Sequence, residues 1–417
     1  GGKTLKTRWL KSLWVIYLSS ALMLFSITPA WAGNVVSDPS TDIVTGDGNQ
    51  VYGTHDKVAG DSNTVGLGKK VLGVPITLDS SNNNKVEGDG NTIYGDTNTV
   101  TGDGNKLGDN LGLTTLKSSS NTVTGDNNTL SGLSGNNTIT GSGNKLSTTL
   151  LVGSSNNKIS GDGNESSASG SNTVVGDGNK FQALSNSNKV TGNGNDFSAS
   201  GSNTVIGDGN KFQALSDNNT ATGNGNQFSA SSGNIVTGDA NKVTVSNDNE
   251  VTGSGNELSA SSNNTVTGAN NKLGLAGSNN ISGNANTVFT GSSNTISGNN
   301  NAVSLGSNNA IVGNSNGVTL GNNNAITGGS NQVIGSQNAL TVNNNGVSGS
   351  SNAITGNSNS VLAADSNTIT GNSNTVALGN NNSISGNSNG IGGSSNTVNG
   401  NSNGVAGSSN TIAGNSN

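Results

Sequence analysis

A short repeat with one obligatory apolar residue constrains this chain more than any other feature. The unit reads Asn, any residue, Val/Ile/Leu, any residue, Gly and two small polar residues, and it recurs every seven or eight residues. Units that begin at Asn294, Asn301, Asn309 and Asn316 show it cleanly, and the same spacing starts at Asp42. A chain of this kind must bury a thin column of side chains rather than one broad core.

The repeat fits β-strands and not a coiled coil. A heptad coiled coil needs two apolar positions among good helix formers, whereas this repeat has one among Gly, Asn, Ser and Thr. In the segment 121–125, strand alternation places Asn121, Val123 and Gly125 on one face and two threonines on the other. The Asp-Asn and Gly-Asp-Gly-Asn segments that follow such strands favour tight corners, because these residues tolerate positive φ.

The predicted fold is all-β: a parallel β-solenoid, or β-roll. Two units form a two-strand coil of about 14–16 residues, and the inward asparagines of successive coils would form amide ladders like those of cross-β structures. The residues predicted to form the core are Val44, Val51, Val58, Val65, Val123, Ile296, Val303, Ile311, Val318, Ile326, Val333, Ile354 and Ile369.

The N-terminal segment has the pattern of a secretory signal peptide. A basic stretch precedes the apolar run 13–27, and Ala30-Trp31-Ala32 supplies small residues at cleavage-site spacing. We therefore expect a protein that is secreted or exposed on the outer cell surface. The expected organisation is a signal peptide at 1–32, a lead-in at 33–41 and a solenoid at 42–417 with longer excursions near 66–83, 106–120 and 145–155.

Composition argues against several classes of function. After residue 32 the chain has no Trp, Met, Cys or Arg, one histidine, and more acidic residues than lysines. Nucleic acid binding needs a basic patch, so it is not expected. Catalysis has few suitable side chains, so we predict no enzyme activity, no cofactor and no small-molecule substrate. The single histidine, His55, is expected to be a solvated corner residue.

The aspartates of the corners could ligate calcium, because carboxylate and carbonyl oxygens suit that ion. The corners lack the spacing of the calcium-binding β-roll nonapeptide, so turn formation explains them better and we predict no metal site. The residues concerned are Asp47, Asp89, Asp103, Asp162, Asp177 and Asp208. The phenylalanines that recur every 15 or 16 residues favour inner-face packing over carbohydrate stacking: Phe181, Phe197, Phe212 and Phe228.

Pairs of threonines on the outward side of strands suggest a binding face. Regular Thr-x-Thr arrays occur in β-solenoid antifreeze proteins, where hydroxyl and methyl groups order water. Other units carry Lys, Ala, Gly or Ser at these positions, so the sequence shows no long uniform array. The pairs are Thr99 and Thr101, Thr122 and Thr124, Thr138 and Thr140, Thr265 and Thr267, and Thr368 and Thr370.

The best-formed units resemble the head repeats of YadA-type trimeric autotransporter adhesins. The resemblance rests on Asn-Ala-Val-Ser-Leu-Gly (301–306), Asn-Ala-Ile-Val-Gly (309–313), Asn-Gly-Val-Thr-Leu-Gly (316–321) and Asn-Thr-Val-Ala-Leu-Gly (374–379). It implies a left-handed parallel β-roll, a homo-trimer and an adhesive role at the cell surface. The coiled-coil stalk and membrane anchor of that family have no counterpart in this sequence.

The main functional hypothesis is an adhesin-like structural rod that makes multivalent contacts with a surface, a matrix or itself. The first alternative is an ice-binding β-solenoid that uses the outward threonine pairs. The second is a functional-amyloid or fibre subunit, because Asn-rich repeats with few charges and little proline can polymerise end to end through open strand edges.

Overall fold

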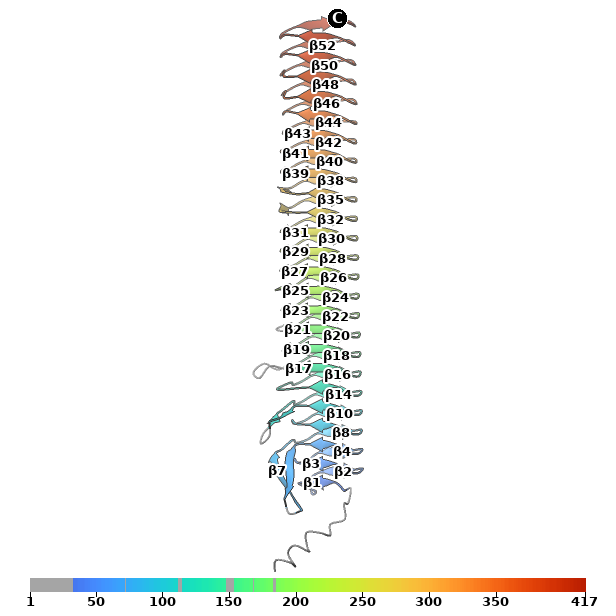
Figure 1. The fold of residues 1–417 in the computed structure, drawn as a ribbon, viewed down its shortest axis with the longest axis vertical. Coiled ribbons are helices and arrows are strands. Elements are labelled where there is room, and N and C mark those ends of the chain that lie inside the picture. The colour runs from blue at the N-terminus through green and yellow to red at the C-terminus, as the bar shows by residue number, and fades with distance from the viewer. Residues whose placement is uncertain (1–32, 72, 112–114, 148–153, 168, 183–184) are drawn as a thin grey trace, which may run out of the picture. The chain divides into compact units, whose positions relative to one another are not determined.

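The structure is a computed structural model that describes residues 33–417, except 72, 112–114, 148–153, 168 and 183–184. The predicted signal peptide therefore lies outside the described residues. The chain divides into two compact units, residues 1–120 and 121–417, and each unit contains stacked two-strand coils (Figure 1). The predicted parallel β-solenoid is confirmed. Over the described ranges, no helix is long and apolar enough to cross a membrane.

Unit 2, residues 121–417, contains two parallel sheets, here called sheet A and sheet B. The coils alternate between them, and residues paired in neighbouring strands are mostly 14–16 positions apart, as predicted. A longer coil of 20 residues separates Thr138 from its partner Lys158. Every strand thus hydrogen-bonds to the equivalent strand of the next coil.

Sheet B of unit 2 consists of β14 (Thr122–Thr124), β16 (Thr138–Thr140), β18 (Lys158–Ser160), β20 (Thr173–Val175), β22 (Lys189–Thr191), β24 (Thr204–Ile206), β26 (Thr220–Thr222), β28 (Ile235–Thr237), β30 (Glu250–Thr252), β32 (Thr265–Thr267), β35 (Asn280–Ser282), β38 (Thr295–Ser297), β40 (Ala310–Val312), β42 (Ala325–Thr327), β44 (Ala339–Thr341), β46 (Ala353–Thr355), β48 (Thr368–Thr370), β50 (Ser383–Ser385), β52 (Thr397–Asn399) and β54 (Thr411–Ala413).

Sheet A of unit 2 consists of β15 (Thr129–Leu130), β17 (Lys145–Ser147), β19 (Glu165–Ser167), β21 (Lys180–Gln182), β23 (Asp196–Ser198), β25 (Lys211–Gln213), β27 (Gln227–Ser229), β29 (Lys242–Thr244), β31 (Glu257–Ser259), β33 (Lys272–Leu273), β36 (Thr287–Val288), β39 (Ala302–Ser304), β41 (Gly317–Thr319), β43 (Gln332–Ile334), β45 (Gly346–Ser348), β47 (Ser360–Leu362), β49 (Thr375–Ala377), β51 (Gly390–Gly392) and β53 (Gly404–Ala406). A short parallel pair, β34 (Ala276–Gly277) and β37 (Gly291–Ser292), lies outside both sheets.

Unit 1 repeats this plan and adds two antiparallel hairpins. Its coil strands are β1 (Val35–Val36), β3 (Gln50–Val51), β5 (Thr64–Val65), β9 (Thr92–Ile93) and β11 (Lys106–Leu107) of sheet A, and β2 (Ile43–Thr45), β4 (Lys57–Ala59), β8 (Lys85–Glu87) and β10 (Thr99–Thr101) of sheet B. The hairpins pair β6 (Leu67–Val71) with β7 (Val74–Asp79), and β12 (Asp109–Asn110) with β13 (Thr115–Leu116).

The hairpins lie in the segments 66–83 and 106–120, where longer excursions were expected. Part of the third expected excursion, near 145–155, falls on residues outside the described ones.

The core of each coil is one inward side chain per strand, which is apolar in almost every coil strand; β19 has the buried Ser166 at this position. The predicted core residues from Val51 to Ile369 are at most 2% exposed. Val44 is different: it was predicted inside, but it is half-buried, because β2 pairs in register with β4 and no strand covers its other side among the described residues. Each buried aliphatic side chain stabilises the stack by roughly 1.5–3 kcal/mol.

Amide ladders complete the inside of the stack, as predicted. Asn309 donates from Nδ2 to Oδ1 of Asn294 at 2.9 Å and to the carbonyl of Gly321 at 3.0 Å. Its backbone N–H donates to the same Oδ1 at 3.0 Å. The pattern repeats coil after coil in one column before sheet B and another before sheet A, so these buried amides are satisfied.

The four phenylalanines lie inside sheet A, as predicted from their spacing. Phe181, Phe197, Phe212 and Phe228 are at most 1% exposed and stack with ring centroids 4.6–4.9 Å apart. They lie in coils of 15 and 16 residues, and because all four rings are buried they form no row for an external ligand.

Candidate functional site

The third residue of each sheet B strand points outward and forms an uncharged column through unit 2. Each of its members is exposed, and most are Thr or Ser. The column is Thr124, Thr140, Ser160, Val175, Thr191, Ile206, Thr222, Thr237, Thr252, Thr267, Ser282, Ser297, Val312, Thr327, Thr341, Thr355, Thr370, Ser385, Asn399 and Ala413.

The first residue of each sheet B strand forms a parallel outward column that changes along the stack. It carries charge at Lys158, Lys189 and Glu250, and after Glu250 it holds only Thr, Asn, Ala and Ser. The segment from β32 to β54 therefore presents two adjacent uncharged columns of small side chains. We call this surface the hydroxyl face; it consists of the first and third residues of these sheet B strands.

The predicted threonine pairs all lie on sheet B strands. Their side chains are exposed, except Thr99, which is half-buried on β10 of unit 1. The structure brings two of the pairs together, because Thr122 and Thr124 are in register with Thr138 and Thr140.

The expectation that no long uniform threonine array exists agrees with these columns, which mix Thr with Ser, Ala, Val, Ile and Asn. Their lack of charge was missed, because alternate repeat units belong to different sheets and the column appears in the sequence only when every second unit is compared. That reading also finds pairs that were missed, such as Thr220 and Thr222 on β26.

Backbone pairing fixes the spacing of the hydroxyl face. Thr327, Thr341, Thr355 and Thr370 are consecutive partners in four neighbouring strands. Parallel strands lie about 4.8 Å apart, and residues two apart in one strand lie about 6.6 Å apart. Threonine is stiff at χ1, so its hydroxyl and methyl groups are held in a regular two-dimensional array.

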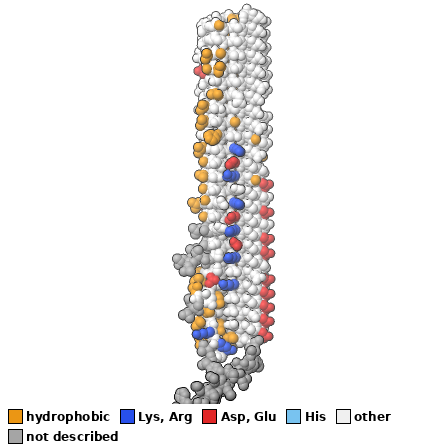
Figure 2. Space-filling view, viewed as in Figure 1, with side chains coloured by type: hydrophobic (Ala, Val, Ile, Leu, Met, Phe, Trp, Pro, Cys, Tyr) orange, Lys and Arg blue, Asp and Glu red, His pale blue; other side chains and the backbone are white. Residues whose placement is uncertain are grey.

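The outward face of sheet A has a different chemistry. In the first half of unit 2, its first-residue column alternates in charge, visible as the blue and red column in Figure 2. Lys242 and Glu257 form an ion pair at 3.5 Å in this column. The residues of the column are Lys145, Glu165, Lys180, Asp196, Lys211, Gln227, Lys242, Glu257 and Lys272.

The corner aspartates take part in turn chemistry. Oδ1 of Asp177 accepts the backbone N–H of Asp162 at 2.7 Å, and Oδ1 of Asp103 accepts that of Asp89 in the same way. Asp208 accepts from the N–H of Asn193 at 2.6 Å. Across the described ranges, no group of three or more His, Cys, Asp or Glu side chains could hold a metal ion. Asp47 and the exposed His55 also lie at corners of unit 1.

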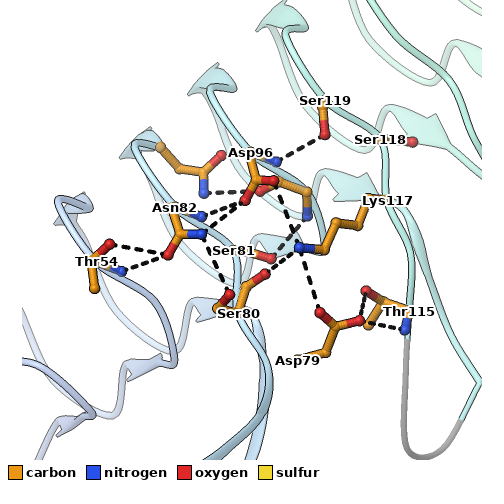
Figure 3. A network of polar contacts seen from close by, with 12 residues as sticks. Thr54, Asp79, Ser80, Ser81, Asn82, Asp96, Thr115, Lys117, Ser118 and Ser119 are labelled. Carbon is orange, nitrogen blue, oxygen red and sulfur yellow. Dashed lines mark hydrogen bonds and ion pairs between the residues drawn. The ribbon is translucent and has the colours of Figure 1, made fainter.

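A polar network in unit 1 fastens the bases of the two hairpins (Figure 3). The Lys117 ammonium lies 3.5 Å from Asp79 and 3.6 Å from Asp96, and it donates to the carbonyl of Ser80 at 2.7 Å. Thr115 donates to Asp79 from both its backbone N–H and its hydroxyl at 2.8 Å. The network joins β7 and β13 to the coils and is structural in character.

One buried carboxylate interrupts the amide ladder of unit 1. Asp56 stands where the following coil has Asn84, and its Oδ1 accepts from the backbone N–H and Nδ2 of Asn84 at 2.8 and 3.0 Å. Its Oδ2 is buried with no hydrogen-bond partner. Burial raises the pKa of Asp56 to about 7 and also raises the pKa of Asp42, the preceding carboxylate of the column.

The comparisons with known proteins point to the same part of the chain as the hydroxyl face. The family model described as "Grass antifreeze beta roll" matches residues 266–356 and 340–417. No curated protein matches the chain, and nothing supports the trimeric adhesin resemblance specifically. The C-terminal part of unit 2 is thus similar to the grass antifreeze β-roll.

Proposed function

We propose that the protein binds ice through the hydroxyl face of unit 2. The observation that carries this proposal is the coincidence of two findings. The two outward columns lose their last charge at Glu250, and the antifreeze β-roll match begins at residue 266. The best-supported function is therefore the ice-binding alternative rather than the adhesin-like rod.

The chemistry of the face suits a crystalline water surface. Ice presents oxygens at fixed repeats, and columns of side chains about 4.8 and 6.6 Å apart approximate such repeats. Threonine methyl groups and alanines cost little to dehydrate, whereas Lys or Glu would retain their water. Each contact is weak, but many contacts on one rigid surface act together.

An alternative explanation is that the outward threonines of sheet B are there only because threonine favours strands. The difference between sheet B and sheet A argues against that explanation. Thr is common in strands for reasons of packing, so a single outward threonine means little. Sheet A offers equal opportunity for threonine, yet its first-residue column is mainly charged from Lys145 to Lys272, and beyond Lys272 it holds mostly Gly and Ala with only two threonines, Thr287 and Thr375. The partner we propose is an ice crystal surface. We also propose a secreted location, which the predicted signal peptide and the similarity to an antifreeze β-roll support.

The experiment compares two triple variants of the described chain, residues 33–417. Thr327→Lys, Thr341→Lys and Thr355→Lys place charges on the hydroxyl face. The matched control, Ser304→Lys, Thr319→Lys and Ser348→Lys, places three charges on the outward face of sheet A in the same part of unit 2. Circular dichroism verifies that both variants keep the β-solenoid.

Thermal hysteresis and the shape of ice crystals grown in the protein solution are the measurements. The unmodified protein and the sheet A control should depress freezing and shape crystals equally, and the hydroxyl-face variant should lose most of both effects. The proposal fails if the unmodified protein does neither, or if the two variants behave alike.

A further inference from the structure

A second surface of unit 2 remains after the hydroxyl face is assigned. Large apolar side chains lie at the ends of sheet A strands or within two residues after them, and Figure 2 shows apolar side chains gathered along one edge. Their exposed fractions range from 51% at Leu305 to 75% at Leu378. We call this surface the apolar edge; it consists of Leu275, Phe289, Leu305, Leu320, Leu362 and Leu378.

Three of these leucines occupy a backbone conformation that disfavours them. Leu305, Leu320 and Leu378 have φ values of 55°, 53° and 51°. A bulky residue in the left-handed region is strained, and Gly or Asn would fit with less strain. The ladder enforces the conformation: the N–H of Leu320 donates to the carbonyl of Ser304, and that of Leu378 to the carbonyl of Leu362, each at 3.0 Å.

The opposite corner of the same coils shows that left-handed positions need no leucine. There the residue directly after the strand is glycine: Gly298, Gly313 and Gly328 have φ values of 131°, 128° and 123°. The leucines therefore serve neither the turn nor the core. Strain combined with exposure of apolar surface indicates that their side chains serve a contact outside the chain.

We propose that the apolar edge docks a second copy of this chain side by side. Apolar groups recur along the edge at the spacing of the coils, about 4.8 Å or a small multiple of it. A partner must repeat at the same interval to contact the edge over several coils, and a second copy has that repeat. The contact would be isologous, with the same strip on both copies.

Charge also favours a second copy. The chain carries a formal net charge of −6, so two copies repel each other over most of their surface. Between Leu275 and Leu378 the only charged side chain is Asp365, so the apolar edge lies in a segment where that repulsion is weakest.

The size of the apolar edge sets the expected strength. The strip from β33 to β49 crosses about seven coil intervals, or roughly 34 Å, and is one side chain wide. Such a strip lies at the low end of specific interfaces, so the dimer should be weak and depend on concentration. The apolar edge shares no residue with the hydroxyl face, so dimer formation and the proposed ice binding can be tested separately.

Sedimentation velocity over a series of concentrations of residues 33–417 tests the proposal. The test variant combines Leu305→Asn, Leu320→Asn and Leu378→Asn; Asn tolerates left-handed φ, so thermal unfolding should occur at the same or a higher temperature. The matched control combines Ile206→Asn, Ile235→Asn and Val312→Asn, which removes exposed apolar groups from sheet B.

The unmodified chain and the sheet B control should shift from monomer to dimer as concentration rises, while the apolar-edge variant stays monomeric. Three results would overturn the proposal. One is a monomeric unmodified chain up to roughly millimolar concentration. The second is equal loss of dimer in both variants. The third is open-ended polymers that the leucine substitutions leave intact.

Discussion

The two sheets of unit 2 share one interior and have two different exteriors. In neighbouring strands β44 to β47, Leu340, Val347, Ile354 and Val361 are all at most 3% exposed, and each strand is preceded by a buried Asn of an amide ladder. The outward residues of the two sheets differ. From β17 to β33, eight of the nine first residues of sheet A strands are charged, whereas from β16 to β32 only Lys158, Lys189 and Glu250 are charged at that position on sheet B.

This contrast separates what the fold requires from what a function selects. The coil favours one apolar side chain and one Asn per strand on the inside, and both sheets comply in almost every coil. Nothing in the coil requires Thr at the majority of outward positions of sheet B while Lys, Glu and Asp fill most of the first-residue column of sheet A up to Lys272. The outward difference is therefore the part of the sequence that carries functional information.

The largest predicted effect tests whether the interior is the same in both sheets. Asn324→Ala in the sheet B column and Asn316→Ala in the sheet A column each remove two Nδ2 donations and an Oδ1 that accepts two bonds from the next coil. Each substitution should lower the free energy of unfolding by about 4 kcal/mol, because several buried polar groups lose their partners.

Urea denaturation with local hydrogen exchange measures this loss, and Thr341→Ala is the control, with an expected change within about 0.5 kcal/mol. A loss confined to one of the two asparagine columns would contradict the shared interior.

The next effect concerns a carboxylate that stands in the ladder in place of an asparagine. Asp56 occupies an Asn position before β4, and burial raises its pKa from 3.8 to about 7. Folding then takes up a proton between about pH 4 and 7, so the stability it contributes is complete below pH 4 and is lost as pH rises through 7. The loss should be on the order of 3 kcal/mol.

Unfolding of the described chain at pH 4 and pH 8, followed by hydrogen exchange in unit 1, measures that loss. Asp56→Asn supplies the Nδ2 donor that the ladder lacks at this position. The free energy of unfolding of this variant should therefore depend less on pH. If Asp56→Asn is no more stable than the unmodified chain at pH 8, the buried carboxylate is not the cause. Asp42, whose pKa burial also raises, contributes a smaller slope in the same direction.

The smallest effect concerns the charged exterior of sheet A. Glu257→Thr removes the ion pair with Lys242, whose partners are about half exposed. Exposed pairs contribute little, so the free energy of unfolding should fall by less than about 1 kcal/mol, and less at high salt. Thermal hysteresis should not change. A loss of several kcal/mol would mean that the alternating column is part of the fold and not a free exterior.

The interior could be predicted from the sequence because its pattern is local. The spacing of Asn and Val within one unit fixes the phase of the strand, which is enough to place Val123 or Ile354 inside. Val44 was misplaced because burial also depends on whether strands lie on both sides, which the unit itself does not specify.

The outward columns, the corner leucines and the polar network at the hairpins of unit 1 could not be predicted in the same way. Thr341 and Thr355 are neighbours in space but are separated in sequence by a unit of the other sheet. Leu305 and Leu320 stand at left-handed corners where turn rules expect Gly or Asn. The Lys117 network joins Asp79 and Asp96, which do not recur at the spacing of the repeat, so the periodicity of the sequence does not predict it.

The central claim, that the hydroxyl face binds ice, has a direct test, because the chain contains no cysteine. Thr341→Cys on sheet B and Thr319→Cys on sheet A are each labelled with a bulky maleimide, and incorporation into a slowly growing ice crystal is measured. Ice should take up the protein labelled at position 319 as fully as the unlabelled protein, and should exclude most of the protein labelled at position 341. Equal uptake of both labelled proteins would contradict the account.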